Sequence, residues 1–287
     1  EFRRVLFRSR YRPDAIGDIL FNGIAQWAAR ENVATGIQAD GSWQIDDRHT
    51  LRAGFVVQTE RAGVAARSAV LPLDNTGAQT SNIPLSIVGN QQNVGQLYGI
   101  YVQDEWRITP TFTLNAGLRF DAVSQFTHES QVSPRINAVW KPTADTTFHA
   151  GYARYFVPPP FAALSPTTIA SLLNTSAAPE TTRNDPARAE RSHYFDVGME
   201  QTLAPGLTVA IDAYYKHSTN LLDEGQFGSP IVLTAFNYRE GRQTGVELSL
   251  SYDQGPWSAY GNVAYSRAVG RRISSAQYNF GAAELAY

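Results

Sequence analysis

The chain has 287 residues, with no cysteine and a single methionine, and its 24 basic and 26 acidic side chains give a net charge of −2. The absence of cysteine excludes disulfide scaffolds, cysteine nucleophiles and thiolate metal sites, and the near-neutral charge argues against a nucleic-acid partner, which needs a basic surface. Charged residues make up 17% and aromatic residues 11% of the chain, a balance that argues against intrinsic disorder. No apolar run reaches the roughly 18 residues that a membrane helix needs.

The first 32 residues give no clear strand pattern. Residues 1–10 (EFRRVLFRSR) are rich in arginine and resemble translated cloning or adapter sequence, so this artefact-like leader is excluded from the fold prediction. Residues 11–32 carry some apolar residues at helical spacing, including Ile16, Ile19 and Leu20, but glycines interrupt them. We interpret 11–32 as an irregular or loop segment; a short helix or a loop leading into the first strand both remain open.

From residue 33 onward the dominant pattern is an alternation of apolar and polar residues with period two. In residues 37–45 the apolar positions include Ile37 and Trp43, and residues 51–60 repeat the pattern after a polar turn. Successive side chains of a strand point to opposite faces of the sheet, so each segment has one apolar and one polar face. The two segments therefore predict an antiparallel hairpin.

The same pattern recurs along the rest of the chain. Further hairpins are predicted at 98–120, 136–152, 195–215 and 246–265. Their short turns contain the Pro, Gly or Asp residues that tight turns prefer. The sequence thus predicts about ten strands of roughly ten residues each. The polar stretches between hairpins are predicted to be long loops, at 61–95, 122–132, 157–191, 218–241 and from 268 onward.

Three features favour a transmembrane barrel over a soluble sandwich or soluble barrel. The strands approach the 9–11 residues that cross a bilayer when tilted, and short turns alternate with long loops, as in outer-membrane barrels. The third feature is the placement of tryptophan beside the short turns, where an indole ring suits the membrane interface. These predicted interface residues are Trp43, Trp106, Trp140 and Trp257.

Tyrosines near the long-loop ends are predicted to supply a second aromatic girdle, comprising Tyr152, Tyr155, Tyr194, Tyr215 and Tyr265. The apolar faces largely avoid charge, as a lipid-facing surface must. Asp104 and Arg154 are exceptions, each near a strand end, and for Asp104 a β-bulge near residues 103–105 is one explanation.

Charged residues on the polar faces are predicted to line a wet barrel lumen. Arg119, Asp121 and Arg135 are predicted to form a charge ladder between strands, with a structural role favoured over ligand contact.

Five aromatic residues near the third and fourth long loops are candidate ligand contacts, because binding residues favour loops on a rigid scaffold. They are Tyr155, Phe156, Phe227, Phe236 and Tyr238; an aromatic belt with a rigid loop exit is the alternative interpretation.

Four segments resemble parts of one known family, in the order in which that family has them. They are YVQDEWRITPTFTLNAGLRFD (101–121), SPRINAVWKPTADTTFHAGYARYFVPP (133–159), GMEQTLAPGLTVAIDAYYKHSTNLL (198–222) and GRQTGVELSLSY (241–252). Each segment is similar to a hairpin or strand in the β-barrel of TonB-dependent outer-membrane receptors. The resemblance covers about residues 33–287.

The resemblance implies an all-β fold, in which this chain supplies about ten antiparallel strands of a 22-stranded transmembrane barrel. It also implies a receptor in the outer membrane of a Gram-negative bacterium that takes up a scarce ligand, such as a siderophore–iron complex, cobalamin or a sugar. The expected partners are outer-membrane lipid, a plug domain, a periplasmic TonB-type coupling protein and a small-molecule ligand of unknown identity. We identify no plug and no coupling segment in the sequence, so we expect 33–287 to be an interior piece of a barrel. The coupling protein is expected to bind the N-terminus of the parent protein, which we expect to be missing from this chain.

No sequence motif predicts catalysis. There is no nucleophile elbow, zinc-protease motif, P-loop or dinucleotide-binding glycine pattern. The five histidines (His49, His128, His149, His193 and His217) lack metal-ligand spacing. We therefore expect no catalytic residue, no cofactor, no metal site and no enzymatic activity. The alternatives to an active receptor are a passive porin-like channel and, third, a soluble β-rich binding module or hydrolase.

Overall fold

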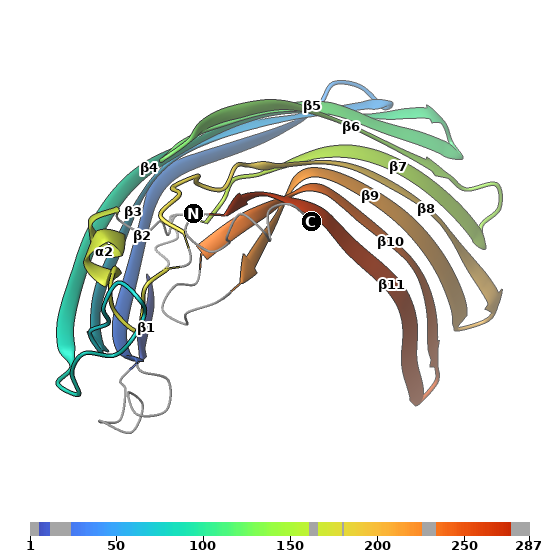
Figure 1. Cartoon of the computed structure of the whole chain (residues 1–287). Coiled ribbons are helices and arrows are strands. Elements are labelled where there is room, and N and C mark those ends of the chain that lie inside the picture. Colours follow the sequence, from blue (N-terminus) through green and yellow to red (C-terminus); the bar gives the residue numbers. More distant parts are fainter. Residues whose placement is uncertain (1–5, 12–23, 161–165, 180, 226–233, 277–287) are drawn as a thin grey trace.

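The computed structural model describes residues 6–11, 24–160, 166–179, 181–225 and 234–276. These residues form one eleven-stranded sheet in which each strand pairs with its neighbours in sequence, from β1 at one edge to β11 at the other. Each pair of neighbouring strands is antiparallel. Figure 1 shows the sheet curving into an open arch that resembles part of a barrel wall. The predicted all-β antiparallel architecture is confirmed.

The strands and the one described helix follow in chain order. They are β1 (Leu6–Tyr11), β2 (Ile24–Gln44), β3 (His49–Val70), β4 (Leu85–Thr109), β5 (Phe112–Ser124), β6 (His128–Trp140), β7 (Thr146–Val157), α2 (Pro166–Leu172), β8 (Glu190–Ala204), β9 (Leu207–Gly225), β10 (Thr234–Gln254) and β11 (Trp257–Ala276). No helix in these described stretches is long and apolar enough to cross a bilayer.

The predicted turns of all five hairpins are present. They lie at 45–48, 110–111, 141–145, 205–206 and 255–256. Gly206 and Gly255 have positive φ angles of 77° and 63°, a conformation that glycine adopts at no steric cost. These turns share one rim of the sheet, which we call the short-turn rim. The opposite rim, which includes the end of β9 and the start of β10, carries the connections 71–84, 125–127 and 158–189, and we call it the long-loop rim.

The predicted lengths of the strands and long loops were wrong. β4 has 25 residues and β3 has 22, so much of the predicted loop 61–95 is strand, and the predicted loop 122–132 shrinks to 125–127. The strands also extend into 218–241 and beyond 268. The reason is physical: alternation appears only where one face is apolar, whereas a strand with two polar faces keeps its backbone pairing but has the composition of a loop.

The N-terminal assignments also change. Within the segment 11–32, residues 24–32 belong to β2, whereas 12–23 lie outside the described residues. Residues 6–10 of the excluded leader, together with Tyr11 of the segment 11–32, form β1, which pairs with β2 from Leu6↔Val33 to Tyr11↔Ala28. Pairing with a neighbouring strand thus overrides the weak local pattern of these residues.

The expected β-bulge near residues 103–105 is absent. The β3–β4 register is continuous from His49↔Trp106 to Val70↔Leu85. The β4–β5 register shifts only between Arg107 and Thr109, next to the turn. Asp104 therefore stays on the apolar face, and its partner is described below.

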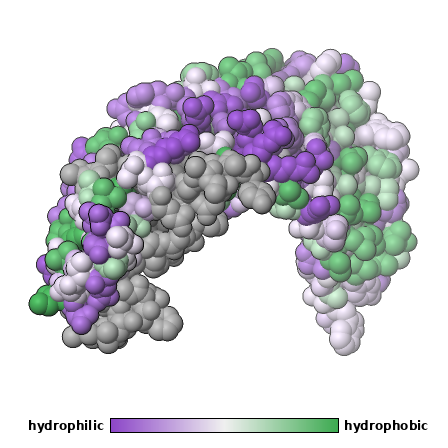
Figure 2. All heavy atoms as spheres, viewed as in Figure 1, coloured by the Kyte–Doolittle hydropathy of each residue, from purple (hydrophilic) through white to green (hydrophobic). Residues whose placement is uncertain are grey.

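The sheet is a single layer with little enclosed core in its described residues. A small cluster forms where α2 and the following loop cover the long-loop rim, and it joins Val70, Leu172 and Ala177 with the partly buried Ile87. Many large apolar side chains remain exposed. Figure 2 shows hydrophobic residues gathered on the limb that carries the turns of β8–β11, and hydrophilic residues across the middle of the arch.

Candidate functional site on the inner face of the sheet

The strand register sorts the side chains onto two faces. One row across neighbouring strands comprises Ala39, Phe55, Ile100, Phe120 and Val132. Ile100 is 58% exposed and Val132 52% exposed, although both are strongly apolar. We call this apolar side the outer face, and the opposite, polar side the inner face. From the short-turn rim an apolar band of alternating residues spans Phe112–Phe120 on β5 and Leu207–Tyr215 on β9, close to the 9–11 residues of a tilted strand that crosses a bilayer.

The four predicted interface tryptophans all lie on the outer face beside a short turn. Trp43, Trp106, Trp140 and Trp257 are 55%, 41%, 48% and 73% exposed. The first three belong to the strands that enter the turns at 45–48, 110–111 and 141–145, and Trp257 begins β11. This common position is what an interfacial girdle requires, and the interfacial role stays a prediction.

Asp104 is accommodated on the outer face by a cross-strand partner. His49 Nδ1 lies 2.7 Å from Asp104 Oδ2, and the His49 ring stacks on Trp106 with centroids 5.5 Å apart. All three residues lie near the short-turn rim, where a charged group costs little compared with the bilayer midplane. The contact with His49 therefore explains how the Asp104 carboxylate can lie on the apolar face, which the alternation pattern alone does not explain.

The inner face carries ion pairs that connect neighbouring strands. Arg52 donates two hydrogen bonds of 3.0 Å to Glu105 across β3 and β4. Tyr101 donates a 2.7 Å hydrogen bond to Asp40, two strands away. An inner face that is polar along its length is compatible with a water-filled or plugged lumen, and not with a packed apolar barrel core.

Two residues of the predicted charge ladder meet on this face. The Nε and Nη2 atoms of Arg119 lie 2.8 Å from Asp121 Oδ1, within the same strand. Arg135 faces inward on β6, in register with Gly117, and forms no ion pair within the described residues. The structure thus brings together Arg119 and Asp121 but does not join Arg135 to them.

A histidine and two aspartates form a second inner-face cluster across β7, β8 and β9. His149 Nε2 lies 3.0 Å from Asp212 Oδ1 and 3.7 Å from Asp196 Oδ2. Gly198 makes room for them, because a Cβ there would lie 2.1 Å from Asp212 Oδ1 and 2.3 Å from His149 Cε1. The alternation pattern did not reveal this cluster, because it depends on the register between three strands. No described group of His, Asp or Glu has metal-binding geometry.

The expected second girdle divides between the two faces. Tyr152 and Tyr215 lie on the outer face, where each contacts Phe195, with centroids 5.0 and 6.4 Å apart. Tyr155 and Tyr194 instead face inward, where Tyr194 contacts Tyr155 at 5.9 Å and Tyr214 at 6.0 Å. The assignment of Tyr155 and Tyr194 to the lipid side was therefore wrong, because it ignored strand parity.

The candidate ligand-contact residues have different environments. Tyr155 is 44% exposed on the inner face, and Phe156 lies under the Arg191 guanidinium, 5.6 Å from the ring centroid. Phe236 is fully buried and packs against Tyr238 in a T-shaped contact of 5.2 Å, so it presents no surface to a ligand here. Phe227 lies outside the described residues.

A buried polar cluster, missed by sequence reasoning, secures the strands at the long-loop rim. Glu190 Oε1 accepts hydrogen bonds from Ser192 and Ser218 and lies 2.8 Å from Lys216 Nζ. Glu190 Oε2 accepts a 3.1 Å bond from the Leu222 amide. Burial raises the pKa of the Glu190 carboxyl, but these hydrogen bonds and the Lys216 charge outweigh it, so the pKa lies below its usual value.

The long connection 158–189 crosses to the loop that follows β3. Thr175 forms an antiparallel bridge with Pro72, the Leu71 amide donates to Ser176 Oγ at 2.9 Å, and the Ser176 amide donates to the Leu71 carbonyl at 2.8 Å. Figure 1 shows α2, within this connection, beside the β2–β4 part of the sheet rather than beside β7 and β8. Two connections far apart in sequence are thereby joined at the long-loop rim.

Comparison with known proteins gives a consistent result. Residues 3–287 match a family model described as TonB dependent receptor-like, beta-barrel. A search of curated protein sequences found no match.

Solved structures show the same fold at low sequence identity. The ferric yersiniabactin uptake receptor FyuA of Yersinia pestis aligns with a TM-score of 0.62 and 16% identity, covering 92% of this chain and 38% of FyuA. The FrpB iron transporter of Neisseria meningitidis gives 0.58 and 17%, covering 86% of this chain and 36% of FrpB. The copper transporter OprC gives 0.56 and 19%, covering 88% and 40%. The chain therefore spans somewhat over a third of the length of these proteins.

Proposed function

We propose that this chain, which belongs to the TonB-dependent receptor-like β-barrel family, forms part of the wall of an outer-membrane receptor that actively takes up a scarce ligand. The observation that carries the proposal is the contrast between the two faces of one sheet. The outer face carries exposed apolar side chains such as Ile100, Val132 and Leu248, whereas the inner face holds the ion pairs Arg52–Glu105 and Arg119–Asp121. Such a wall separates lipid from a polar lumen.

Transport, rather than catalysis, suits the chemistry of the inner face. Arg52 pairs with Glu105 across two strands, Arg119 pairs with Asp121 within one strand, and His149 lies beside Asp212, as in a structural lumen lining; these groups are partly open to solvent. An uncommitted nucleophile beside a base, which an enzyme of this kind would need, does not occur among the described inner-face clusters. We therefore propose a receptor without enzymatic activity.

The proposed ligand is a small, scarce molecule such as an iron–siderophore chelate. FyuA and FrpB have names that refer to ferric yersiniabactin and to iron, and the name of OprC refers to copper; this range supports a metal or metal chelate as the first class to test. Inner-face aromatic residues near the long-loop rim, such as Tyr155 and Tyr194, are the candidate contacts. A plug domain and a periplasmic TonB-type coupling protein are the proposed partners, and the Gram-negative outer membrane is the proposed location.

Uptake by intact cells tests this proposal. The complete protein would be expressed in a Gram-negative host lacking its own iron receptors, and accumulation of ferric citrate, ferric desferrioxamine B and ionic copper would be followed with radioactive metal. We expect at least one probe to accumulate above the empty-vector level, and a protonophore or deletion of the host coupling protein to abolish the gain.

A conductance measurement separates the receptor from the passive channel. A plugged receptor reconstituted in a planar bilayer should conduct almost no current, whereas a porin-like barrel should give large, steady conductance steps. Steady conductance together with uptake that persists in the protonophore would overturn active transport and favour a passive channel. Recovery of the protein in the soluble fraction would overturn the membrane assignment itself.

A further inference from the structure

A row of cationic and imidazole side chains lies on the outer face near the long-loop rim. Register neighbours from β7 to β10 in this row are Arg154, His193, His217 and Arg242. The outer face is otherwise apolar towards the short-turn rim, as shown by the 47–49% exposed Val246 and Leu248. A basic row at this position interrupts the apolar surface and needs an explanation.

The row lies immediately beyond the apolar band. Tyr152, Phe195 and Tyr215 form the last aromatic row of the band, and the basic row follows two residues further along each strand. The Tyr152 hydroxyl lies 2.9 Å from His193 Nδ1, and the Arg242 guanidinium lies 6.0 Å from the centre of the Tyr215 ring. Aromatic rings mark the membrane interface, so the basic row lies at the level of the lipid headgroups.

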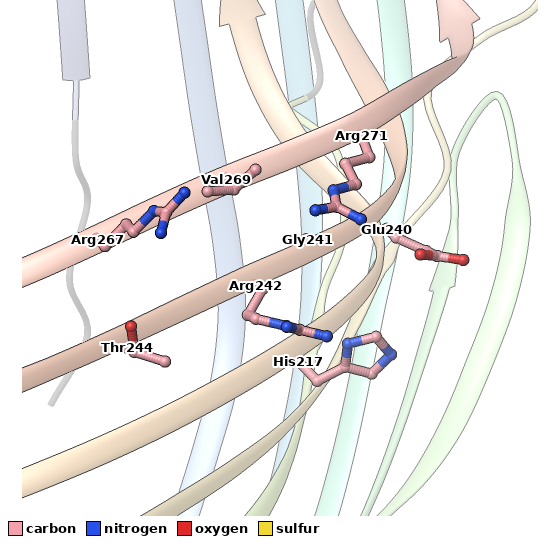
Figure 3. A pocket seen from close by; sticks show the side chains of 8 residues that line it. All are labelled: His217, Glu240, Gly241, Arg242, Thr244, Arg267, Val269 and Arg271. Carbon is pink, nitrogen blue, oxygen red and sulfur yellow. The ribbon is translucent and has the colours of Figure 1, made fainter.

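Two arginines of β11 extend this row into a shallow cavity. Arg267 is in register with Thr244, and Arg271 with Glu240, so both side chains share the outer face with Arg242. Together with His217 they line a cavity of about 290 Å³. Figure 3 shows the three arginines and His217 around this cavity, with the Glu240 side chain extending away from Arg271.

The arginines of this cavity are not neutralised by protein carboxylates. Arg242, Arg267 and Arg271 are all exposed, and none of them forms an ion pair with any described residue. Glu240 is the one acidic residue in the lining and forms no ion pair with the arginines. Three guanidinium groups facing one acid leave an excess of positive charge beside an apolar surface.

We propose that this cavity binds the phosphate group of an anionic lipid headgroup in the outer leaflet. The planar guanidinium group donates paired hydrogen bonds to phosphate oxygens, and each basic residue near an anionic lipid surface contributes about 1 kcal/mol. The apolar band directly below supplies a surface for the acyl chains, through Val246 and Tyr265. A soluble ligand in transit would meet the inner face of the sheet, not this one.

The position of the cavity on the sheet face supports this occupant. β11 is an edge strand in the described sheet, and another strand alongside it would use its backbone N–H and C=O groups. Side chains on the outer face would stay exposed to lipid in either case. The proposal rests on the proposed membrane placement but not on ligand uptake.

Lipid binding by the complete protein, purified from outer membranes in detergent, tests the proposal. Native mass spectrometry would measure the affinity for phosphatidic acid, with phosphatidylcholine as the lipid without net charge and inorganic phosphate as the competitor. We expect Arg271→Gln to weaken phosphatidic acid binding about fivefold, the factor that corresponds to about 1 kcal/mol. The double variant Arg267→Gln/Arg271→Gln should weaken it about 30-fold.

Arg135→Gln is the matched control, because Arg135 is also exposed and has no ion pair in the described structure, yet faces inward. It should leave lipid affinity unchanged. The double variant Arg267→Lys/Arg271→Lys keeps both positive charges. It should restore more than half of the binding free energy that the double glutamine variant loses. This variant keeps the test valid if the glutamine variants fold poorly, as judged by heat-modifiable gel mobility.

Three results would overturn the proposal: an equal effect of Arg135→Gln, equal binding of phosphatidylcholine, or competition by inorganic phosphate at lipid-like concentrations. The first would indicate general electrostatic attraction, the second a purely apolar contact, and the third a site for a free anion. Recovery of the protein in the soluble fraction before purification would instead refute the membrane placement, so the two failures are distinguishable. Loss of ligand uptake would not bear on lipid binding.

Discussion

Replacing Leu248 with arginine tests the assignment of the outer face most directly. Leu248 is 49% exposed and lies in register between Ile211 and Val263, in the middle of the apolar band of β10. In a water-soluble sheet, changing an exposed leucine to arginine would be nearly neutral, within about 0.5 kcal/mol. In a lipid-facing position the same change has a large cost.

The expected cost follows from the depth of Leu248. The residue lies four positions from Tyr252, near the short-turn rim, and four from Thr244, at the far end of the band. With a rise of about 3.3 Å per residue and a tilt near 45°, this places it roughly 9–10 Å from either end of the band. An arginine near the bilayer midplane destabilises a barrel by about 2–4 kcal/mol, and we expect Leu248→Arg to fall in this range.

Reversible unfolding in denaturant measures the effect. The complete protein would be folded into phospholipid vesicles, and the folded fraction followed by tryptophan fluorescence and by heat-modifiable gel mobility. Ser249→Arg is the matched control, since it introduces the same side chain one residue away on the inner face. A cost for Leu248→Arg below about 0.5 kcal/mol, or equal to that of Ser249→Arg, would refute the assignment of the two faces.

Three further predictions concern packing and loop attachment. Gly198→Ala should destabilise the protein by about 1–3 kcal/mol, because the new methyl group collides with Asp212 and His149; an unchanged denaturant midpoint would contradict this packing. Because the pKa of Glu190 is lowered on folding, its stabilising effect is present above the ordinary carboxyl pKa and is lost as the pH falls through the lowered value. Hydrogen exchange corrected for intrinsic rates should therefore show the Leu222 amide losing protection in acid, and Glu190→Gln should remove that pH dependence; protection that is independent of pH in the unmodified protein would refute the argument. Ser176→Ala removes the acceptor of the Leu71 amide and should cost about 1 kcal/mol locally, seen as faster exchange in 71–84, whereas unchanged exchange there would show that this contact does not hold the loop.

The candidate site was only partly predictable from sequence. Arg119 and Asp121 lie two positions apart on one strand, so their shared face follows from alternation alone. The Arg52–Glu105 pair and the His149 cluster depend on which residues of different strands stand opposite one another. The mistaken grouping of Tyr155 with Tyr152 was avoidable, because an odd separation on a regular strand places two residues on opposite faces.

The sequence by itself determined the five hairpins, the short-turn rim and the apolar outer face. These features are local, because alternation, turn residues and tryptophan placement all act within about ten residues and strand parity fixes which side chains share a face. The tertiary structure alone decided how far the strands continue, since β4 keeps its pairing well beyond the apolar band. It also decided the contact between 158–189 and 71–84 and the meeting of Arg242 with Arg267 and Arg271. Where both faces meet water, composition no longer distinguishes strand from loop, and only backbone pairing between strands sets the structure.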